Sequence, residues 1–81
     1  MEKVYRVRAS AHIKPKGERK FHRLNQTVAI DSSVLNLSKE ALQSFVEASL
    51  KARYGAERVS EVRWVEIEEG IILGEDTFWK E

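Results

Sequence analysis

The stretch that decides the fold is VYRVRASAHIK at residues 4–14, where apolar and polar side chains alternate from Tyr5 onward. The odd-numbered positions place five apolar side chains on one face: Tyr5, Val7, Ala9, Ala11 and Ile13. The even-numbered positions place polar side chains on the other face: Arg6, Arg8, Ser10, His12 and Lys14. A period of two residues is typical of a β-strand with one buried face, so we predict such a strand here.

A second strand is predicted over residues 21–30, whose core-facing side chains are Leu24, Gln26, Val28 and Ile30. Pro15 and Gly17 between the two strands are typical turn residues, which makes the pair a hairpin. Because the odd side of the first strand and the even side of the second must face one core, the numbers of paired residues sum to an odd value. A four-residue loop starting at Pro15 satisfies this condition and pairs Tyr5 with Val28. A shift of two residues keeps the same faces.

A helix over residues 39–54 has the clearest periodicity in the chain. Side chains that are almost all apolar recur there every three or four positions: Leu42, Phe45, Val46, Ser49, Leu50 and Tyr54. Ser38 in front of the helix is a good N-cap, and Gly55 behind it fits a left-handed C-terminal cap. The boundaries of this helix are therefore defined at both ends.

A third strand is predicted over residues 62–68 on the same alternation as the first two. Its core face carries Val65 and Ile67, and its other face carries Trp64, Glu66 and Glu68. A right-handed helical crossover returns this strand beside the first one. We therefore predict an α+β fold in two layers, β-β-α-β, with one helix packed on a three-stranded antiparallel sheet of order 2-1-3. The sheet becomes four-stranded if the C-terminal tail adds a strand.

The composition fits one small domain over residues 1–81, with 42% hydrophobic residues, 33% charged residues and a net charge of +1. The chain has no cysteine, which excludes a disulfide scaffold, a zinc ribbon and a cysteine nucleophile. No apolar run approaches the roughly 18 residues of a membrane span. We expect a soluble cytoplasmic protein that does not bind a membrane.

Basic residues concentrate early in the chain, where residues 1–30 hold eight Lys and Arg against two Glu. One helix covers only one face of a three-stranded sheet, so the other face stays open. Basic residues beside aromatic rings on an open sheet are typical of proteins that bind single-stranded nucleic acid. The residues predicted to bind a polyanion or a partner include the basic hairpin loop at 14–20 and are Arg8, His12, Lys14, Lys16, Arg19, Lys20, Phe21, Arg23 and Trp64.

An alternative for the open face is charge neutralisation between strands. An antiparallel third strand brings Glu66 and Glu68 near the arginines of the first strand, and such pairs are ordinary sheet contacts worth about 0.2–1 kcal/mol. These pairs do not reach the tip of the hairpin, where residues 12–23 hold five Lys and Arg against Glu18 alone. The tip is therefore either a polyanion contact or a solvated loop.

The C-terminal tail at residues 70–81 carries five large apolar side chains, namely Ile71, Ile72, Leu73, Phe78 and Trp79. This is an unusual composition for a free terminus. We expect residues 71–73 to continue from a turn at Glu69 and Gly70 and to pack on the sheet edge or the core. Phe78 and Trp79 should anchor either on this domain or on a partner.

The sequence carries no pattern typical of a catalytic site. His12 and His22 face opposite sides of the predicted hairpin, and no Ser, His and Asp spacing matches a nucleophile elbow. The four glycines are scattered singly, so there is no glycine-rich phosphate loop. We therefore expect no enzymatic activity, no metal, no cofactor and no small-molecule substrate.

The layout of residues 3–69 resembles a known family. A charged hairpin with a glycine, one helix ending at Tyr54–Gly55 and a Val65-Glu66-Ile67-Glu68 strand are similar to those of the small archaeal ribosomal protein LX. The resemblance implies an RNA-contacting subunit of a larger particle. The family's Gly-Ser-Lys-His turn after the helix is replaced here by Gly55-Ala56-Glu57-Arg58, so the chain is not assigned to this family.

Two hypotheses for the function follow. The first is a non-enzymatic module that binds a protein partner, or a second copy of itself, through the open sheet face and the apolar tail. Such a module would be a small regulator, a phage-type inhibitor or a subunit of an assembly. The second is a module for RNA or single-stranded nucleic acid that uses the basic hairpin with Phe21 and Trp64. The near-zero net charge favours the first, because dedicated nucleic-acid-binding proteins are usually strongly basic.

Overall fold

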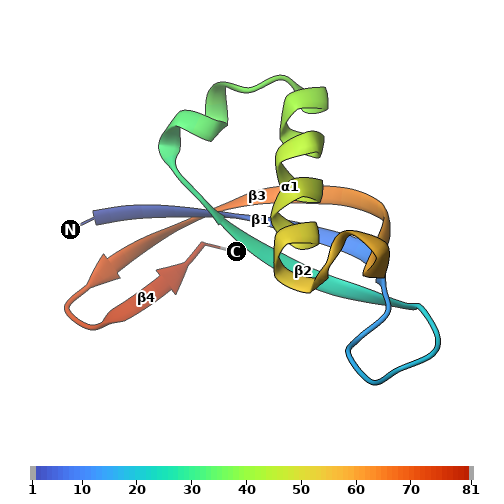
Figure 1. Cartoon of the computed structure of the whole chain (residues 1–81). Helices are drawn as coiled ribbons and strands as arrows, with labels where there is room; N and C mark the ends of the chain where they lie inside the picture. Colours follow the sequence, from blue (N-terminus) through green and yellow to red (C-terminus); the bar gives the residue numbers. More distant parts are fainter. Residues whose placement is uncertain (1, 81) are drawn as a thin grey trace.

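The computed structural model describes residues 2–80 and contains four antiparallel strands and one α-helix (Figure 1). The elements in chain order are β1 (Glu2–Ile13), β2 (His22–Ile30), the 3-10 helix η1 (Ser32–Asn36), α1 (Lys39–Tyr54), the 3-10 helix η2 (Ala56–Arg58), β3 (Val59–Leu73) and β4 (Asp76–Trp79). The strands lie in the order β2-β1-β3-β4 in one curled sheet. The predicted α+β fold with order 2-1-3 is therefore confirmed, and β4 is the fourth strand. Residues 1 and 81, the ends of the predicted domain, lie outside the described residues.

The β1–β2 hairpin has the predicted parity but not the predicted pairing. Tyr5 lies opposite Ile30 instead of Val28, so the register is shifted by two residues and the same side chains still face the core. The expected turn is present, because the Glu18 N–H donates to the Pro15 carbonyl and Gly17 has a φ of 87°. The strands do not pair directly beside this turn, since the Lys14 N–H donates to the Arg58 carbonyl of η2 instead. This contact lengthens the loop to residues 14–21.

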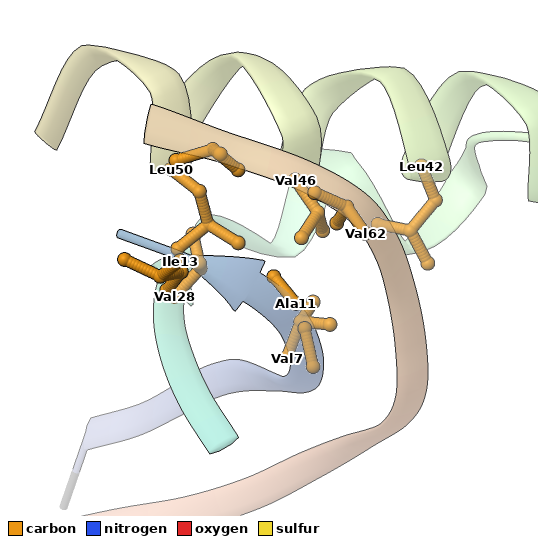
Figure 2. Close-up of a cluster of buried hydrophobic side chains, with 10 residues drawn as sticks. Val7, Ala11, Ile13, Val28, Leu42, Val46, Leu50 and Val62 are labelled. Carbon is orange, nitrogen blue, oxygen red and sulfur yellow. The ribbon is translucent and has the colours of Figure 1, made fainter. Parts of the chain in front are cut away.

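The core lies between α1 and one end of the sheet (Figure 2). The side chains of β1 that face the helix are fully or almost fully buried, and α1 contributes residues four positions apart along one stripe. The buried cluster consists of Val7, Ala9, Ala11, Ile13, Val28, Leu42, Val46, Leu50, Val59 and Val62. The predicted N-cap is present, because the Ser38 hydroxyl accepts from the Ala41 N–H. Gly55 ends the helix as expected and has a positive φ of 104°, but its ψ of 138° lies outside the left-handed helical region of the predicted cap. The local signals in the sequence thus place the helix correctly.

The predicted inward and outward faces of the third strand are wrong in its first half, which lies under α1. The register between β1 and β3 shifts between Arg8 and Ala9, so that Val65 has no direct partner in β1. An extra residue in one strand reverses the parity beyond it. As a result, Trp64 lies opposite Ala9 and packs against the core, whereas Val65 is 53% exposed. The predicted placement of Trp64 on the open face is therefore wrong.

The C-terminal tail forms the β3–β4 hairpin, in which residues 70–73 at the end of β3 pair with residues 76–79 of β4. Residues 69–70 lie inside β3, so the expected turn at Glu69 and Gly70 is wrong and the chain turns at Gly74, which has a φ of 65°. A two-residue loop with glycine first fits the type II′ turn that matches the twist of paired strands. In Figure 1 the β3–β4 hairpin projects beyond the part of the sheet that α1 covers.

Candidate interaction surfaces

The open face is the side of the sheet away from α1, and several of its charged side chains are paired with one another, whereas Arg63, opposite Ser10, forms no salt bridge within residues 2–80. Arg6 lies opposite Glu68 and Arg8 opposite Glu66, with nitrogen to oxygen distances of 2.8 and 3.1 Å. The alternative of charge neutralisation between strands therefore describes this part of the face. Exposed pairs contribute little to stability, but they leave these two arginines without free charge for a ligand.

The second shift in the β1–β3 register supplies another acidic partner. It falls between Ser10 and His12, where Glu61 has a φ of 49° and lies in the extra position of β3. One oxygen of Glu61 lies 2.6 Å from His12 Nδ1 and 3.4 Å from a guanidinium nitrogen of Arg23. Sequence reasoning missed Glu61, because no local pattern indicates which residue a bulge presents to the neighbouring strand.

Trp79 covers part of the open face at the hairpin end. The guanidinium carbon of Arg6 lies 3.9 Å from the centroid of the Trp79 ring, within the range of a cation–π contact. Gly70 lies opposite Trp79, and a Cβ atom at this position would come within 2.8 Å of the ring. The indole therefore anchors on this domain, and the glycine is what permits its close approach.

The basic loop, residues 14–21, holds four cations that lie outside these ion pairs. Within residues 2–80, no salt bridge is formed by its four basic side chains, Lys14, Lys16, Arg19 and Lys20. The Arg58 guanidinium fixes the start of the loop by donating to the carbonyls of Lys14 and Pro15 at 3.2 Å each. The Phe21 ring is 44% exposed, and Lys14 Nζ lies 5.6 Å from its centroid.

The structure thus divides the predicted polyanion-binding residues into three groups. The loop brings together Lys14, Lys16, Arg19, Lys20 and Phe21. On the open face, Arg8, His12 and Arg23 pair with glutamates. Trp64 lies on the helix side, so the proposed pair of aromatic rings with Phe21 does not share one face.

The second surface is the hairpin patch, which consists of Ile67, Ile71, Leu73 and Phe78 on the helix side of β3 and β4. Ile67 lies opposite Val7, which faces α1, and Phe78 lies opposite Ile71 two pairs further out. Even so, Ile67, Leu73 and Phe78 are 37%, 48% and 53% exposed. The β3–β4 hairpin projects beyond the part of the sheet that α1 covers (Figure 1). The sequence indicates these apolar residues, but only the register shows that they share one face.

The charges inside the hairpin patch are paired. Glu69 lies between Ile67 and Ile71 along β3, and both Lys3 Nζ and Lys80 Nζ lie 3.3 Å from its carboxylate. The hydrogen bond from Lys80, followed by that from Lys3, lowers the pKa of Glu69 from its ordinary value of 4.5. The patch therefore offers apolar surface around a cluster in which two lysines pair with one carboxylate.

The described part of the chain contains no cluster of three potential metal ligands and no membrane-spanning helix. No three His, Asp or Glu side chains within residues 2–80 come together in a way that would hold a metal ion. No helix over the same residues is long and apolar enough to cross a bilayer. The groove along the sheet edge near Trp79 is lined mainly by Arg6, Arg8, Glu66 and Glu68, which already pair with one another.

Comparison with known proteins gives no relative. No family model, no curated protein and no solved structure matches this chain. The surfaces described above are therefore the basis for a functional proposal.

Proposed function

We propose that this chain is a small non-enzymatic interaction module that binds a protein partner through the hairpin patch. The observation that carries the proposal is the exposure of Ile67, Leu73 and Phe78 on one face of the projecting β3–β4 hairpin. Contiguous apolar side chains that remain exposed on a small domain mark sites of protein interaction. A cytoplasmic location is part of the same proposal, in keeping with the absence of cysteine.

The pairing of charges supports the hairpin patch over the open face as the binding surface. A partner on the open face would have to displace the Arg6–Glu68 and Arg8–Glu66 pairs, and Trp79 already covers part of it. A partner on the hairpin patch removes apolar surface from water at about 25 cal/mol per Å² and disturbs only the Glu69 cluster. Binding to the hairpin patch therefore costs less.

A second candidate function is the binding of RNA or single-stranded nucleic acid through the basic loop. Its support is the set of four loop cations without a salt bridge in residues 2–80, next to the exposed Phe21 ring. Because Trp64 faces the helix, stacking would rest on Phe21 alone. Affinity of this kind depends strongly on salt, because phosphate contacts release counterions.

Phe78 and Phe21 offer a matched test of the two functions. Both rings are about half exposed. Phe78 lies in β4, which pairs with β3 beside the start of β1, whereas Phe21 lies in the loop that follows the end of β1. We would purify tagged wild type, Phe78→Glu and Phe21→Glu from native lysate with and without nuclease, after checking by circular dichroism that each variant folds.

If the hairpin patch is the binding surface, co-purifying proteins should remain after nuclease treatment. These proteins should be lost with Phe78→Glu and retained with Phe21→Glu. Partners that disappear with nuclease or with Phe21→Glu would favour the basic loop. Proteins retained equally by all three chains would contradict the hairpin patch as the binding site.

A further inference from the structure

The outer side of β4 is an unpaired strand edge. Within residues 2–80, β4 pairs with β3 alone. The Lys80 N–H donates to the Glu69 carbonyl at 2.8 Å, so every second residue of β4 directs its backbone groups towards β3. By this alternation, Thr77 and Trp79 direct their N–H and C=O groups outwards. Such an edge is a template for another strand.

We propose that a second copy of this chain binds here, with its β4 antiparallel to the first β4 about a two-fold axis at Phe78. This inference rests on the proposed function, because it names the partner of the same hairpin patch. In this arrangement Thr77 of each copy pairs with Trp79 of the other, so the outward backbone groups meet. Phe78 lies opposite Phe78 of the second copy, and Asp76 lies opposite Lys80 of the second copy.

The charge pattern of β4 selects this register over its neighbours. Outward backbone groups also meet when the strands shift by two residues in either direction. One shift places Phe78 opposite Asp76 and Trp79 opposite Glu75 of the second copy. The other shift places Phe78 opposite Lys80 and Trp79 opposite Trp79 of the second copy. This register and the proposed one both set an aromatic ring against an aromatic ring, but only the proposed register also places Asp76 opposite Lys80, and opposite charges favour cross-strand pairing.

The geometry of the side chains extends the contact beyond the edge. Phe78, Asp76 and Lys80 point to the helix side, where Phe78 adjoins Ile71 and Leu73. The two-fold axis therefore joins the two hairpin patches into one apolar face. Because β4 has only four residues, the interface is smaller than the roughly 1,200 Å² of standard stable complexes. We expect a reversible dimer whose population rises with protein concentration.

A charge exchange tests the register directly. Sedimentation equilibrium of the full chain should show a mass that rises from monomer towards dimer with concentration. Asp76→Lys and Lys80→Glu each place two like-charged pairs across the axis, so each alone should weaken association by about tenfold or more. An equimolar mixture of the two variants should recover association. In the mixed dimer the introduced lysine of one chain meets the introduced glutamate of the other, and the remaining Asp76 meets the remaining Lys80.

The matched controls are Glu18→Lys and Lys20→Glu in the basic loop. They make the same changes of charge as the two β4 variants but far from β4, so the dependence of the sedimentation mass on concentration should stay as in the wild type. Recovery in the mixture also separates the interface from folding, since a loosened hairpin in Lys80→Glu would not be repaired by a second variant. A chain that stays monomeric at every concentration, or a mixture that does not recover, overturns the proposed dimer.

The two proposals fail in different ways. If the chain is monomeric while Phe78→Glu still removes a co-purifying protein, the hairpin patch remains a binding site and only the second copy is wrong. If the chain is monomeric and Phe78→Glu removes nothing, both proposals are wrong.

Discussion

The two ends of the helix side of the sheet carry similar apolar side chains with opposite exposure. At one end Val7 and Ile13 are fully buried under α1, and at the other Leu73 and Phe78 are about half exposed. The 16 residues of α1 span about 24 Å, whereas the 15 residues of β3 span about 50 Å. One helix of this length covers only part of the sheet. The comparison shows that coverage by α1, and not residue type, separates the buried core from the exposed apolar surface in this domain.

The largest loss of stability is expected from a substitution at the end of the sheet that α1 covers. Leu50→Ala removes a fully buried side chain and leaves a cavity, so it should lower the free energy of unfolding by about 2–5 kcal/mol. Phe78→Ala removes a larger side chain at the uncovered end, and should change the free energy of unfolding by no more than about 0.5 kcal/mol. Urea unfolding at low protein concentration, followed by circular dichroism, measures both values. Similar losses for the two variants would show that Phe78 belongs to the core.

An intermediate effect is expected at Gly70, where the hairpin meets the rest of the domain. A Cβ at this position would lie 2.8 Å from the Trp79 ring and 3.0 Å from the Phe78 carbonyl oxygen. Gly70→Ala should therefore displace β4 and lower the free energy of unfolding by about 1–3 kcal/mol, as overpacking does. Thermal unfolding gives the change in stability, and fluorescence in a Trp64→Phe background reports the environment of Trp79.

The double variant Gly70→Ala with Trp79→Ala serves as the control for this clash. Without the ring, the added methyl group has more space, so the two changes together should cost less than the sum of the single changes. Strict additivity would contradict the proposed close packing of Trp79 on Gly70.

The smallest effect is expected from the charge cluster in the hairpin patch. Lys80 and Lys3 lower the pKa of Glu69, so this carboxylate stabilises the folded state at neutral pH. That contribution is lost as the pH falls below about 4.5 towards the lowered pKa of the folded state. Thermal midpoints measured from pH 7 to pH 3 should therefore fall less in Glu69→Gln than in the wild type. Glu57→Gln, which removes a carboxylate without a salt bridge in residues 2–80, should follow the wild-type profile.

The candidate surfaces differ in how far they can be predicted from the sequence, because their residues are spread over different lengths of the chain. The basic loop is predictable from the sequence, because its cations lie within eight consecutive residues. The hairpin patch is only half predictable: the apolar residues of the tail are evident, but their common face depends on how β3 pairs with β1 and β4. The glutamates that contact Arg8, His12 and Arg23 come from β3, far away in the sequence.

The sequence by itself determines the alternation of β1, the ends of α1, the parity of the first hairpin and the strand order 2-1-3. Each of these follows from neighbouring residues or from general rules of chain connection. The tertiary structure alone decides the two-residue register shift, the extra residue at Val65 that turns Trp64 towards the core, and the packing of Trp79 on Gly70. A bulge depends on contacts between strands that are more than 50 residues apart, so the alternation of side chains within one strand does not predict it.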